Sequence, residues 1–253
     1  MGISDDELTH DRFLDGALEI WQPRAGFRAG VDAVFLGAAI DAKAGQTVLE
    51  LGCGVGVASL CLARRVPGLA LTGIEIQSEY ADLARRNASE NSIEMEVAET
   101  DICELPKAIR DQSFDHVFAN PPYYQRSRGS ASKNAGRDLA LAGNTPLSDW
   151  VDVATRRLKP GGQMTFIQKS SRLPDLLEAM DTRLGSVKVK PLAARVGRES
   201  ELVIVTARKG GRAAFKLLAP LILHEGTHHE RDGESYTQIV RDILRSGAPL
   251  EIR

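Results

Sequence analysis

The segment VLELGCGVGVASLCLA, residues 48–63, joins a run of strand-forming residues to a helical pattern through a turn that contains three glycines. Gly52, Gly54 and Gly56 omit side chains where the backbone must turn tightly and let a ligand approach. The helix that follows is expected to present backbone amides to an anionic group. The dinucleotide-binding pattern G-x-G-x-x-G is the obvious alternative, but it requires a third glycine where this chain has Val57.

Short apolar runs alternate with helical patterns along the chain from this first strand onward. The expected strands are 47–51, 69–76, 95–102, 115–120, 163–168, 187–192 and 201–208, and the expected helices are 57–65, 79–91, 147–158 and about 173–184. This alternation predicts an α/β fold with a doubly wound, mainly parallel sheet of seven strands and helices on both faces, a Rossmann-like arrangement. Such a sheet binds ligands beyond the C-terminal ends of its strands.

The chain before the first expected strand of the sheet has a pattern of its own. Residues 14–25 are expected to form a small hairpin, and residues 31–42 a helix. We therefore expect residues 1–45 to be an N-terminal elaboration over the ligand site. Residues 46–253 are expected to form the main part of one continuous domain.

The composition is that of a globular protein with a full-sized core, since 43% of the 253 residues are hydrophobic and 26% are charged. The formal net charge of -2 argues against a general nucleic-acid coat protein. No apolar stretch is long enough to span a bilayer, and the acidic start MGISDDELTH differs from a signal peptide. We therefore expect a cytoplasmic protein without a membrane partner.

Cys53, Cys61 and Cys103 form no metal-binding pair and are expected to be small buried hydrophobic residues.

Basic residues gather in two stretches of the sequence. The first contains Arg126, Arg128, Lys133 and Arg137, and the second contains Lys188, Lys190, Arg195, Arg198, Arg208, Lys209 and Arg212. Each stretch is either solvated surface charge or a rim that binds phosphate groups, and both interpretations stay open. Residues 129–144 form a long polar loop, which we expect to be functional or mobile.

Acidic residues stand at the ends of successive expected strands. Glu75 closes the strand GIEI, where a carboxylate accepts from both hydroxyls of a ribose, and Asp101 is placed to accept from an adenine amino group. Glu50, before the first glycine, is placed to hold an ammonium group. Together with the neighbouring Ile76 and Ile102, these acids predict a site for a molecule that carries a nucleoside and an amino acid.

A second motif, NPPY at residues 120–123, follows the strand DHVFA. Together with ELGCGVG, GIEI and TDI, it resembles the class I S-adenosylmethionine-dependent methyltransferases, and NPPY resembles their branch that methylates amino groups. Three further segments, 21–40, 83–91 and 229–247, are similar to the bacterial family that methylates N6 of an adenine beside the anticodon of a valine tRNA. The resemblance implies S-adenosyl-L-methionine as the cofactor, an RNA substrate, which is tRNA in that family, and no metal. It makes residues 46–253 the methyltransferase domain.

The NPPY residues suit transfer to an amine whose lone pair is delocalised. The Asn120 side-chain oxygen and the Pro121 carbonyl accept the two N–H bonds and orient the nitrogen, while Pro121 and Pro122 restrict the backbone in advance. Asn120 is also predicted to contact the cofactor. Tyr123 supplies a face on which the base stacks, provided that the base is flipped or in a loop. Tyr124 is either a second stacking surface or a core residue.

Two residues before the first strand of the sheet allow two interpretations of their role. Arg28 and Asp32 are placed to close over the methionine end of the cofactor, and a simple helical ion pair between them is equally compatible with their spacing.

Two other acceptors and one non-enzymatic role remain open. The NPPY motif also fits a protein glutamine N5-methyltransferase or a ribosomal RNA guanine-N2 methyltransferase, because it recognises a planar amine without specifying what bears it. A module that binds S-adenosylmethionine and RNA without turnover is the alternative outside enzymes. The complete set from Asn120 to Tyr123 argues against that module.

The sequence also contains H-E-x-x-H, a zinc-protease pattern, at His224, Glu225 and His228. That chemistry needs a helix, which Gly226 and Thr227 disfavour. We therefore expect a surface turn here.

Overall fold

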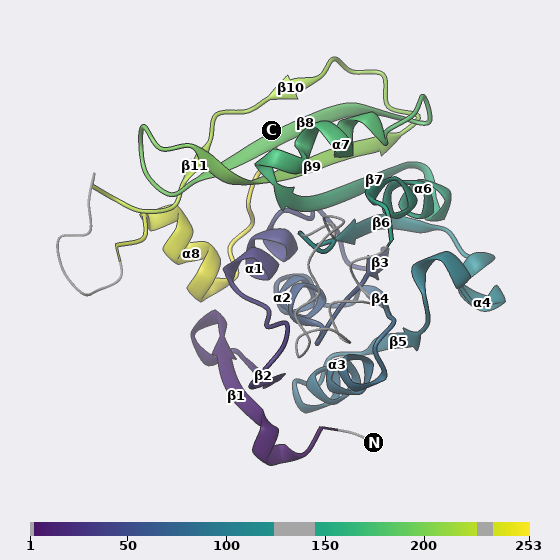
Figure 1. The fold of residues 1–253 in the computed structure, drawn as a ribbon, viewed down its shortest axis with the longest axis vertical. Coiled ribbons are helices and arrows are strands. Elements are labelled where there is room, and N and C mark those ends of the chain that lie inside the picture. Colours follow the sequence, from purple (N-terminus) through teal and green to yellow (C-terminus); the bar gives the residue numbers. More distant parts are fainter. Residues whose placement is uncertain (1–2, 124–144, 227–234) are drawn as a thin grey trace, which may run out of the picture.

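The computed structural model describes residues 3–123, 145–226 and 235–253 (Figure 1). Its main sheet has the strand order β10-β8-β9-β7-β6-β3-β4-β5, with β11 also paired to β8. The strands are β3 (Thr47–Leu51), β4 (Ala70–Glu75), β5 (Met95–Glu99), β6 (Phe114–Ala119), β7 (Leu158–Lys169), β8 (Leu184–Ala193), β9 (Ser200–Lys209), β10 (Lys216–Leu217) and β11 (Leu221–Ile222). The seven expected strands all form, and two short strands extend one edge.

The sheet is mainly parallel, as predicted. Neighbouring strands from β5 to β7 pair in parallel, whereas β9 runs antiparallel between β7 and β8. The chain first winds outward from β3 to β5 and then returns to β6 on the other side of β3. The strand order therefore reverses between β3 and β6, the position at which such sheets bind ligands.

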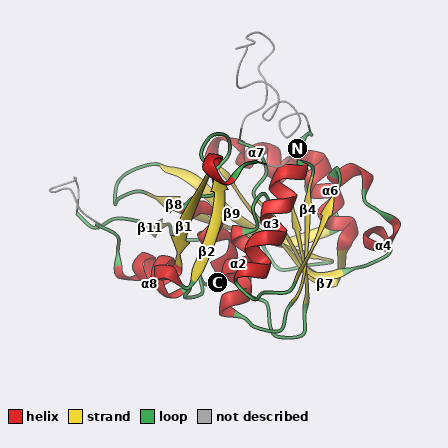
Figure 2. Cartoon of the chain, turned by 90° about the horizontal axis from the view of Figure 1, so that it is seen from below, coloured by secondary structure: helices red, strands yellow, loops and turns green. Residues whose placement is uncertain are grey.

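Helices cover both faces of the sheet (Figure 2), which confirms the predicted doubly wound architecture. One face carries α1 (Val31–Ala38), α2 (Val57–Arg65), α3 (Ser78–Glu90) and α8 (Gln238–Ser246), and the other carries α4 (Lys107–Arg110), α6 (Leu147–Arg157) and α7 (Leu173–Glu178). Short 3-10 turns complete the elements: η1 (Asp5–Glu7), η2 (Leu14–Gly16), η3 (Ile102–Glu104) and η4 (Ser170–Arg172). No helix within the described ranges is both long and apolar enough to span a membrane.

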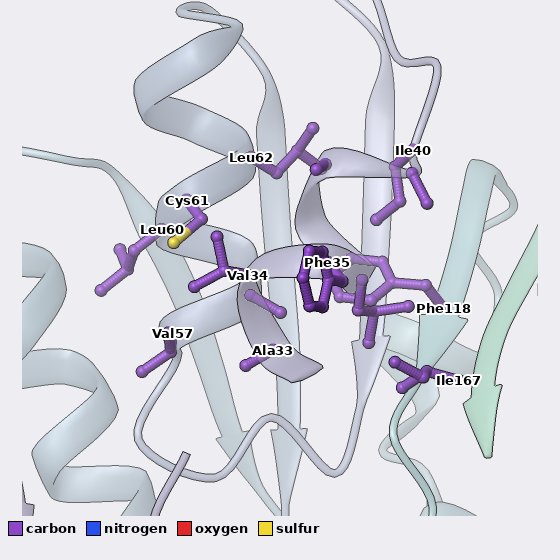
Figure 3. Packing of buried hydrophobic residues seen from close by; sticks show 14 of the residues in the cluster. Ala33, Val34, Phe35, Ile40, Val57, Leu60, Cys61, Leu62, Phe118 and Ile167 are labelled. Atoms are coloured by element: carbon purple, nitrogen blue, oxygen red, sulfur yellow. The ribbon is translucent and has the colours of Figure 1, made fainter. Parts of the chain in front are cut away.

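The packing of α1 against α2 forms the centre of one core. Figure 3 shows Val34 of α1 beside Cys61 of α2, and Phe35 of α1 next to Phe118 of β6. Phe35, Leu60 and Phe118 are at most 1% exposed, so α1 is held firmly over the middle of the sheet.

The N-terminal hairpin forms earlier in the chain than predicted. It consists of β1 (Leu8–Phe13) and β2 (Leu18–Pro23), which pair antiparallel, so Leu14 begins the turn instead of a strand. Leu14 and Asp15 both have positive φ values, 51° and 54°. The first strand was missed because charged residues interrupt it and its burial alternates only weakly.

Two helices end earlier than expected. Helix α1 ends at Ala38, because the Ala38 carbonyl accepts from the Leu250 N–H of the C-terminal segment instead of continuing the helix. Helix α7 ends at Glu178, well before position 184, because Asp181 caps a turn by accepting from the Arg183 N–H and Leu184 begins β8. These differences come from contacts between distant segments or from a local turn that periodicity does not report.

The cysteine prediction is right for two of the three residues. Cys53 and Cys61 are buried, but Cys103 is exposed in the short turn after β5. That turn reaches the surface because it connects β5 to the other face of the sheet, so Cys103 does not serve as a core residue.

Candidate functional site

The three glycines form a turn directly after β3. Gly52, Gly54 and Gly56 all have positive φ values, of 65°, 53° and 89°, which explains their residue type. An added Cβ at Gly52 would come within 2.7 Å of Cη2 of Trp150 on α6, so this position also lacks room for a side chain. Gly56 is the N-cap of α2. The turn thus lies at the C-terminal edge of the sheet, where β3 passes into α2.

Glu75 at the end of β4 ties the glycine turn to the neighbouring strand. Its Oε2 accepts from the Gly54 N–H and its Oε1 from the Gln77 N–H, both at 2.9 Å. Burial raises the pKa of this carboxyl group, while the backbone N–H groups oppose that shift. Each carboxylate oxygen keeps a second lone pair, so the acceptor role predicted for Glu75 toward ribose hydroxyls is compatible with these bonds.

Glu50 lies deeper in the protein than the sequence suggests. It is 3% exposed, and its Oε2 accepts from both the hydroxyl and the backbone N–H of Ser59, at 2.5 and 3.2 Å. Burial raises the pKa of Glu50 to about 8, with the negative charge of Glu75 adding to the shift. Since Ser59 is in the first turn of α2, Glu50 itself satisfies one of the amides that an anionic ligand was expected to meet.

The third acid lies beyond β5, which pairs with β4. Asp101 caps the turn η3 by accepting from the Cys103 N–H at 2.8 Å, and it is half-buried. Ile76 is half-buried after β4, and Ile102 is 6% exposed. The strand order therefore brings Glu50, Glu75 and Asp101 to the same edge of the sheet, where carboxyl groups and apolar side chains lie next to one another.

The NPPY residues continue β6, the strand on the other side of β3. Asn120 Nδ2 donates to Oδ2 of Asp32, and the Tyr123 hydroxyl donates to the same oxygen, both at 2.8 Å. Within the described part of the chain, Oδ1 of Asn120 is buried and has no hydrogen-bond partner. A buried acceptor without a partner is costly unless a ligand supplies the donor, so this oxygen is a candidate substrate contact.

Two residues at the end of β7 support the motif and were not predicted. Gln168 is fully buried, and its Nε2 donates to the Pro121 carbonyl at 3.2 Å. The Lys169 ammonium lies 5.7 Å from the centroid of the Tyr123 ring. The Pro121 carbonyl therefore keeps one lone pair for a substrate donor, and one face of Tyr123 is next to a cation. The predicted succession of strands could have indicated both residues, since they end the strand that comes next in the chain after β6 and pairs with it.

Arg28 does not pair with Asp32, so the helical ion pair is wrong. Its guanidinium bonds Asp11 Oδ2 and the Thr9 hydroxyl on β1, both at 2.6 Å. Helix α1 begins only at Val31, which leaves Arg28 outside the regular helical spacing. Its predicted contact with the cofactor stays a prediction.

Phe27 is a further residue that sequence reasoning missed. It is 53% exposed, and its Cε1 lies 3.8 Å from the position of an added Cβ on Gly54. The Tyr80 hydroxyl of α3 donates to the Phe27 carbonyl at 3.1 Å, which holds this segment beside the glycine turn. An exposed aromatic ring here has no signal in the sequence beyond its proximity to Arg28.

Several predictions lie outside the described residues or away from the site. Tyr124, the loop 129–144 and the first basic stretch all fall in the range that the structure does not describe, as does His228. His224 forms a β-bridge with Tyr236 and stacks on its ring at 4.7 Å. Within residues 3–123, 145–226 and 235–253 no cluster of three or more potential metal ligands occurs.

The donor and acceptor set fits the molecule that the sequence predicts. Carboxyl groups of Glu75 and Asp101 suit ribose hydroxyls and an amino group, Glu50 suits an ammonium group, and the glycine turn removes side chains between them. The Asn120 oxygen, which has no partner among the described residues, lies after β6, the strand next to β3.

Comparisons with known proteins agree with this arrangement. Residues 29–191 match the family model described as methyltransferase small domain. A protein of Porphyromonas gingivalis strain ATCC 33277, named tRNA1(Val) (adenine(37)-N6)-methyltransferase, is 31% identical over 229 residues, covering 86% of this chain and 89% of that protein. One of the same name from Haemophilus influenzae strain Rd is 28% identical over 202 residues, covering 78% and 84%. A crystal structure of a predicted O-methyltransferase from Agrobacterium tumefaciens superimposes with a TM-score of 0.68 at 27% identity, over 88% of this chain and 99% of that one.

Proposed function

Because this chain belongs to the methyltransferase small domain family of class I S-adenosylmethionine-dependent methyltransferases, we propose that it methylates the N6 amine of an adenine in tRNA. S-adenosylmethionine is the methyl donor of this enzyme. The relatives from Porphyromonas gingivalis and Haemophilus influenzae are named for that acceptor and are similar to most of the chain, which supports the tRNA assignment. A tRNA acceptor also implies a cytoplasmic location.

The buried, unpartnered Oδ1 of Asn120 is the observation that carries this proposal. An exocyclic amine on adenine is a poor nucleophile because its lone pair is delocalised into the ring. Two acceptors, Asn120 Oδ1 and the remaining lone pair of the Pro121 carbonyl, bind its two N–H bonds and direct the nitrogen lone pair toward the methyl group. Gln168 holds the Pro121 carbonyl from the other side, which favours a fixed position before the substrate binds.

The other residues of the chain have positioning roles in this mechanism. When bound, S-adenosylmethionine would supply a methyl group that its positive sulfonium activates for transfer. Tyr123 stacks on the adenine and aligns the amine for in-line attack, which requires a flipped or loop nucleotide. No general base is needed before the transfer, because the nitrogen loses its proton readily once it is methylated. Pro121 restricts the backbone between the two acceptors, and Pro122 restricts the backbone directly after them.

The cofactor contacts follow the edge described above. We assign Glu75 to the ribose hydroxyls, Asp101 to the adenine amino group of the cofactor and Glu50 to its ammonium group. Ile76 and Ile102 supply apolar contacts, and Arg28 contacts the methionine end of the cofactor. The glycines at 52, 54 and 56 let the cofactor approach the protein backbone closely.

The acceptor is identified by methyl transfer from radiolabelled S-adenosylmethionine to total tRNA, ribosomal RNA and release factors, each followed by digestion and chromatography. We expect label in N6-methyladenosine from tRNA. Label in methylated glutamine or in N2-methylguanosine would replace this acceptor with a protein or ribosomal RNA. Tight cofactor binding without incorporation of label into any acceptor would indicate a module that binds the cofactor and RNA without turnover.

Replacement of Asn120 tests the role of its side-chain oxygen. Asn120→Ala is expected to lower kcat by roughly 100-fold or more, because one of two acceptors is lost in the transition state, with little change in cofactor affinity. Turnover is measured with tRNA and the cofactor Kd by calorimetry. Asn91→Ala is the control and is expected to keep full activity, since Asn91 caps the C-terminal end of α3 and contacts the N-terminal hairpin. Equal losses of binding and turnover would contradict the assigned role.

A further inference from the structure

Asp32 joins two elements that are far apart in the sequence. Its Oδ2 accepts from Asn120 Nδ2, 88 residues away, and from the Tyr123 hydroxyl, 91 residues away, both at 2.8 Å. These bonds run from the first turn of α1 to the segment after β6. The same carboxylate oxygen therefore accepts hydrogen bonds from two of the four NPPY residues.

The contact decides which way the Asn120 amide points. The oxygen and nitrogen of an asparagine amide have nearly the same shape, so a half-turn of the amide exchanges an acceptor for a donor. A carboxylate only accepts, so the flipped amide would place Oδ1 of Asn120 against Oδ2 of Asp32 and lose a charge-assisted hydrogen bond. Only the orientation present leaves Oδ1 to accept from a substrate amine, since the flipped amide would present N–H groups to it.

Asp32 is itself held in a fixed position. It is the second residue of α1, and its Oδ1 accepts from the Gly30 N–H at 3.2 Å. The residues that follow it, Ala33, Val34 and Phe35, are buried against α2 and β6, as Figure 3 shows. A carboxylate on a rigid helix holds its partners more firmly than one on a loop would.

We propose that Asp32 is a positioning residue of the methyl transfer, which keeps the Asn120 amide in the orientation whose oxygen faces the acceptor nitrogen. The proposal rests on the proposed function in taking Asn120 Oδ1 as a substrate acceptor. It gives Asp32 a role that differs from the contact with the methionine end of the cofactor expected from the sequence.

A reciprocal exchange of the two residues tests this role. Asn120→Asp alone places two carboxylates in contact, whereas Asp32→Asn combined with Asn120→Asp lets the amide at position 32 donate to the new carboxylate. The other oxygen at position 120 then remains an acceptor for the amine, and the Tyr123 hydroxyl accepts as readily as it donates. The measurements are kcat, the cofactor Kd and the pH profile of each variant, with Asp41→Asn as an exposed control for the same substitution.

We expect kcat to fall roughly 10-fold in Asp32→Asn and roughly 100-fold or more in Asn120→Asp, with the cofactor Kd within about 3-fold of the wild type. The double variant is expected to recover at least about 10-fold over Asn120→Asp, because the hydrogen bond is restored in reverse. Asn120→Asp alone should regain activity as the pH falls, when the two carboxylates share a proton. Asp41→Asn should match the wild type.

Two results would overturn the proposal. Losses that multiply in the double variant would mean that Asp32 and Asn120 act independently, and a cofactor Kd that rises as much as kcat falls would assign Asp32 to the cofactor. A structural readout accompanies them: the Asn120 side-chain amide should be protected from hydrogen exchange in the wild type without ligand and lose that protection in Asp32→Ala. If the wild type methylates an acceptor other than tRNA, the cycle is repeated with that acceptor, so failure of the tRNA assignment is told apart from failure of the positioning role.

Discussion

At the scale of single residues, burial changes what a carboxyl group in this site does. Glu50 is fully enclosed beside Ser59 and near Glu75, and burial raises its pKa to about 8. In the folded protein without ligand it therefore holds a proton at neutral pH. An ammonium group next to it would favour the ionised form, so binding of the cofactor couples to loss of that proton.

The raised pKa of Glu50 predicts how stability depends on pH. Between its reference pKa of 4.5 and about 8, the folded state keeps a proton that the unfolded state has lost, so the free energy of unfolding decreases as the pH rises through this window. Glu50→Gln keeps an acceptor for Ser59 but does not titrate. Relative to the wild type, the free energy of unfolding of the variant is therefore expected to increase between pH 4.5 and 8, by an amount on the order of a few kcal/mol. Urea unfolding of both proteins without cofactor, at both ends of the window, measures it, and a difference that does not vary with pH would contradict it.

At the scale of elements, the N-terminal hairpin is held by Asn87 of α3 and by Asn91, which caps the C-terminal end of that helix. Asn87 is fully buried, and it accepts from the Trp21 N–H and donates to the carbonyls of Trp21 and Val55. Asn91 makes the equivalent pair of bonds to the backbone of Glu19, but near the surface. Since Val55 lies between two glycines of the turn, Asn87 connects the hairpin, α3 and the cofactor side of the sheet.

These two asparagines provide a matched comparison of buried and exposed hydrogen bonds. Asn87→Ala is expected to lower the free energy of unfolding by roughly 2 to 4 kcal/mol, because buried backbone groups lose their partners. The same change at Asn91 should cost less than about 1 kcal/mol, since water replaces the lost bonds. Asn87→Ala should also weaken cofactor binding through the displaced Val55 segment. Denaturant midpoints and cofactor titrations provide the comparison, and equal costs at the two positions would refute it.

At the scale of the whole molecule, strand direction decides where charge gathers. The formal net charge is only -2, yet Lys169 ends β7 and Arg172, which pairs with Asp175, follows it. Arg198 precedes β9, which starts at the same edge because it runs antiparallel to β7. These three cations therefore lie along the side of the sheet where the NPPY residues end. Local charge of this kind would favour the RNA binding proposed above, which the overall charge does not.

The salt dependence of tRNA binding measures this local charge. Arg198→Gln is expected to weaken binding and to reduce the slope of log Kobs against log salt concentration by about one, because one phosphate contact is lost. Lys43→Gln, at an exposed position before the N-terminal end of β3, is the control on the opposite edge and should leave the slope unchanged. Filter binding or fluorescence titration at several salt concentrations provides the slopes. If the slope changed equally in both variants, Arg198 would not be part of the RNA-binding surface.

The sequence by itself determined the alternation of strands and helices, the glycine turn after Leu51 and the placement of Glu75 and Asn120 at strand ends. These features are local, because periodicity, positive φ and proline stiffness act within a few residues of the chain. The limits of α1 and the hairpin were less well predicted, since Ala38 ends its helix by binding the distant Leu250.

Only the tertiary structure decided the partners of the site residues. Asp32 meets Asn120, Gln168 meets Pro121 and Arg28 meets Asp11 because the strand order and the position of α1 bring these segments together. The depth of Glu50 was equally hidden in the sequence, since burial is a property of the packed layers around it. Hydrogen bonds and pKa values depend on neighbours in space, and a single sequence does not state which residues those neighbours are.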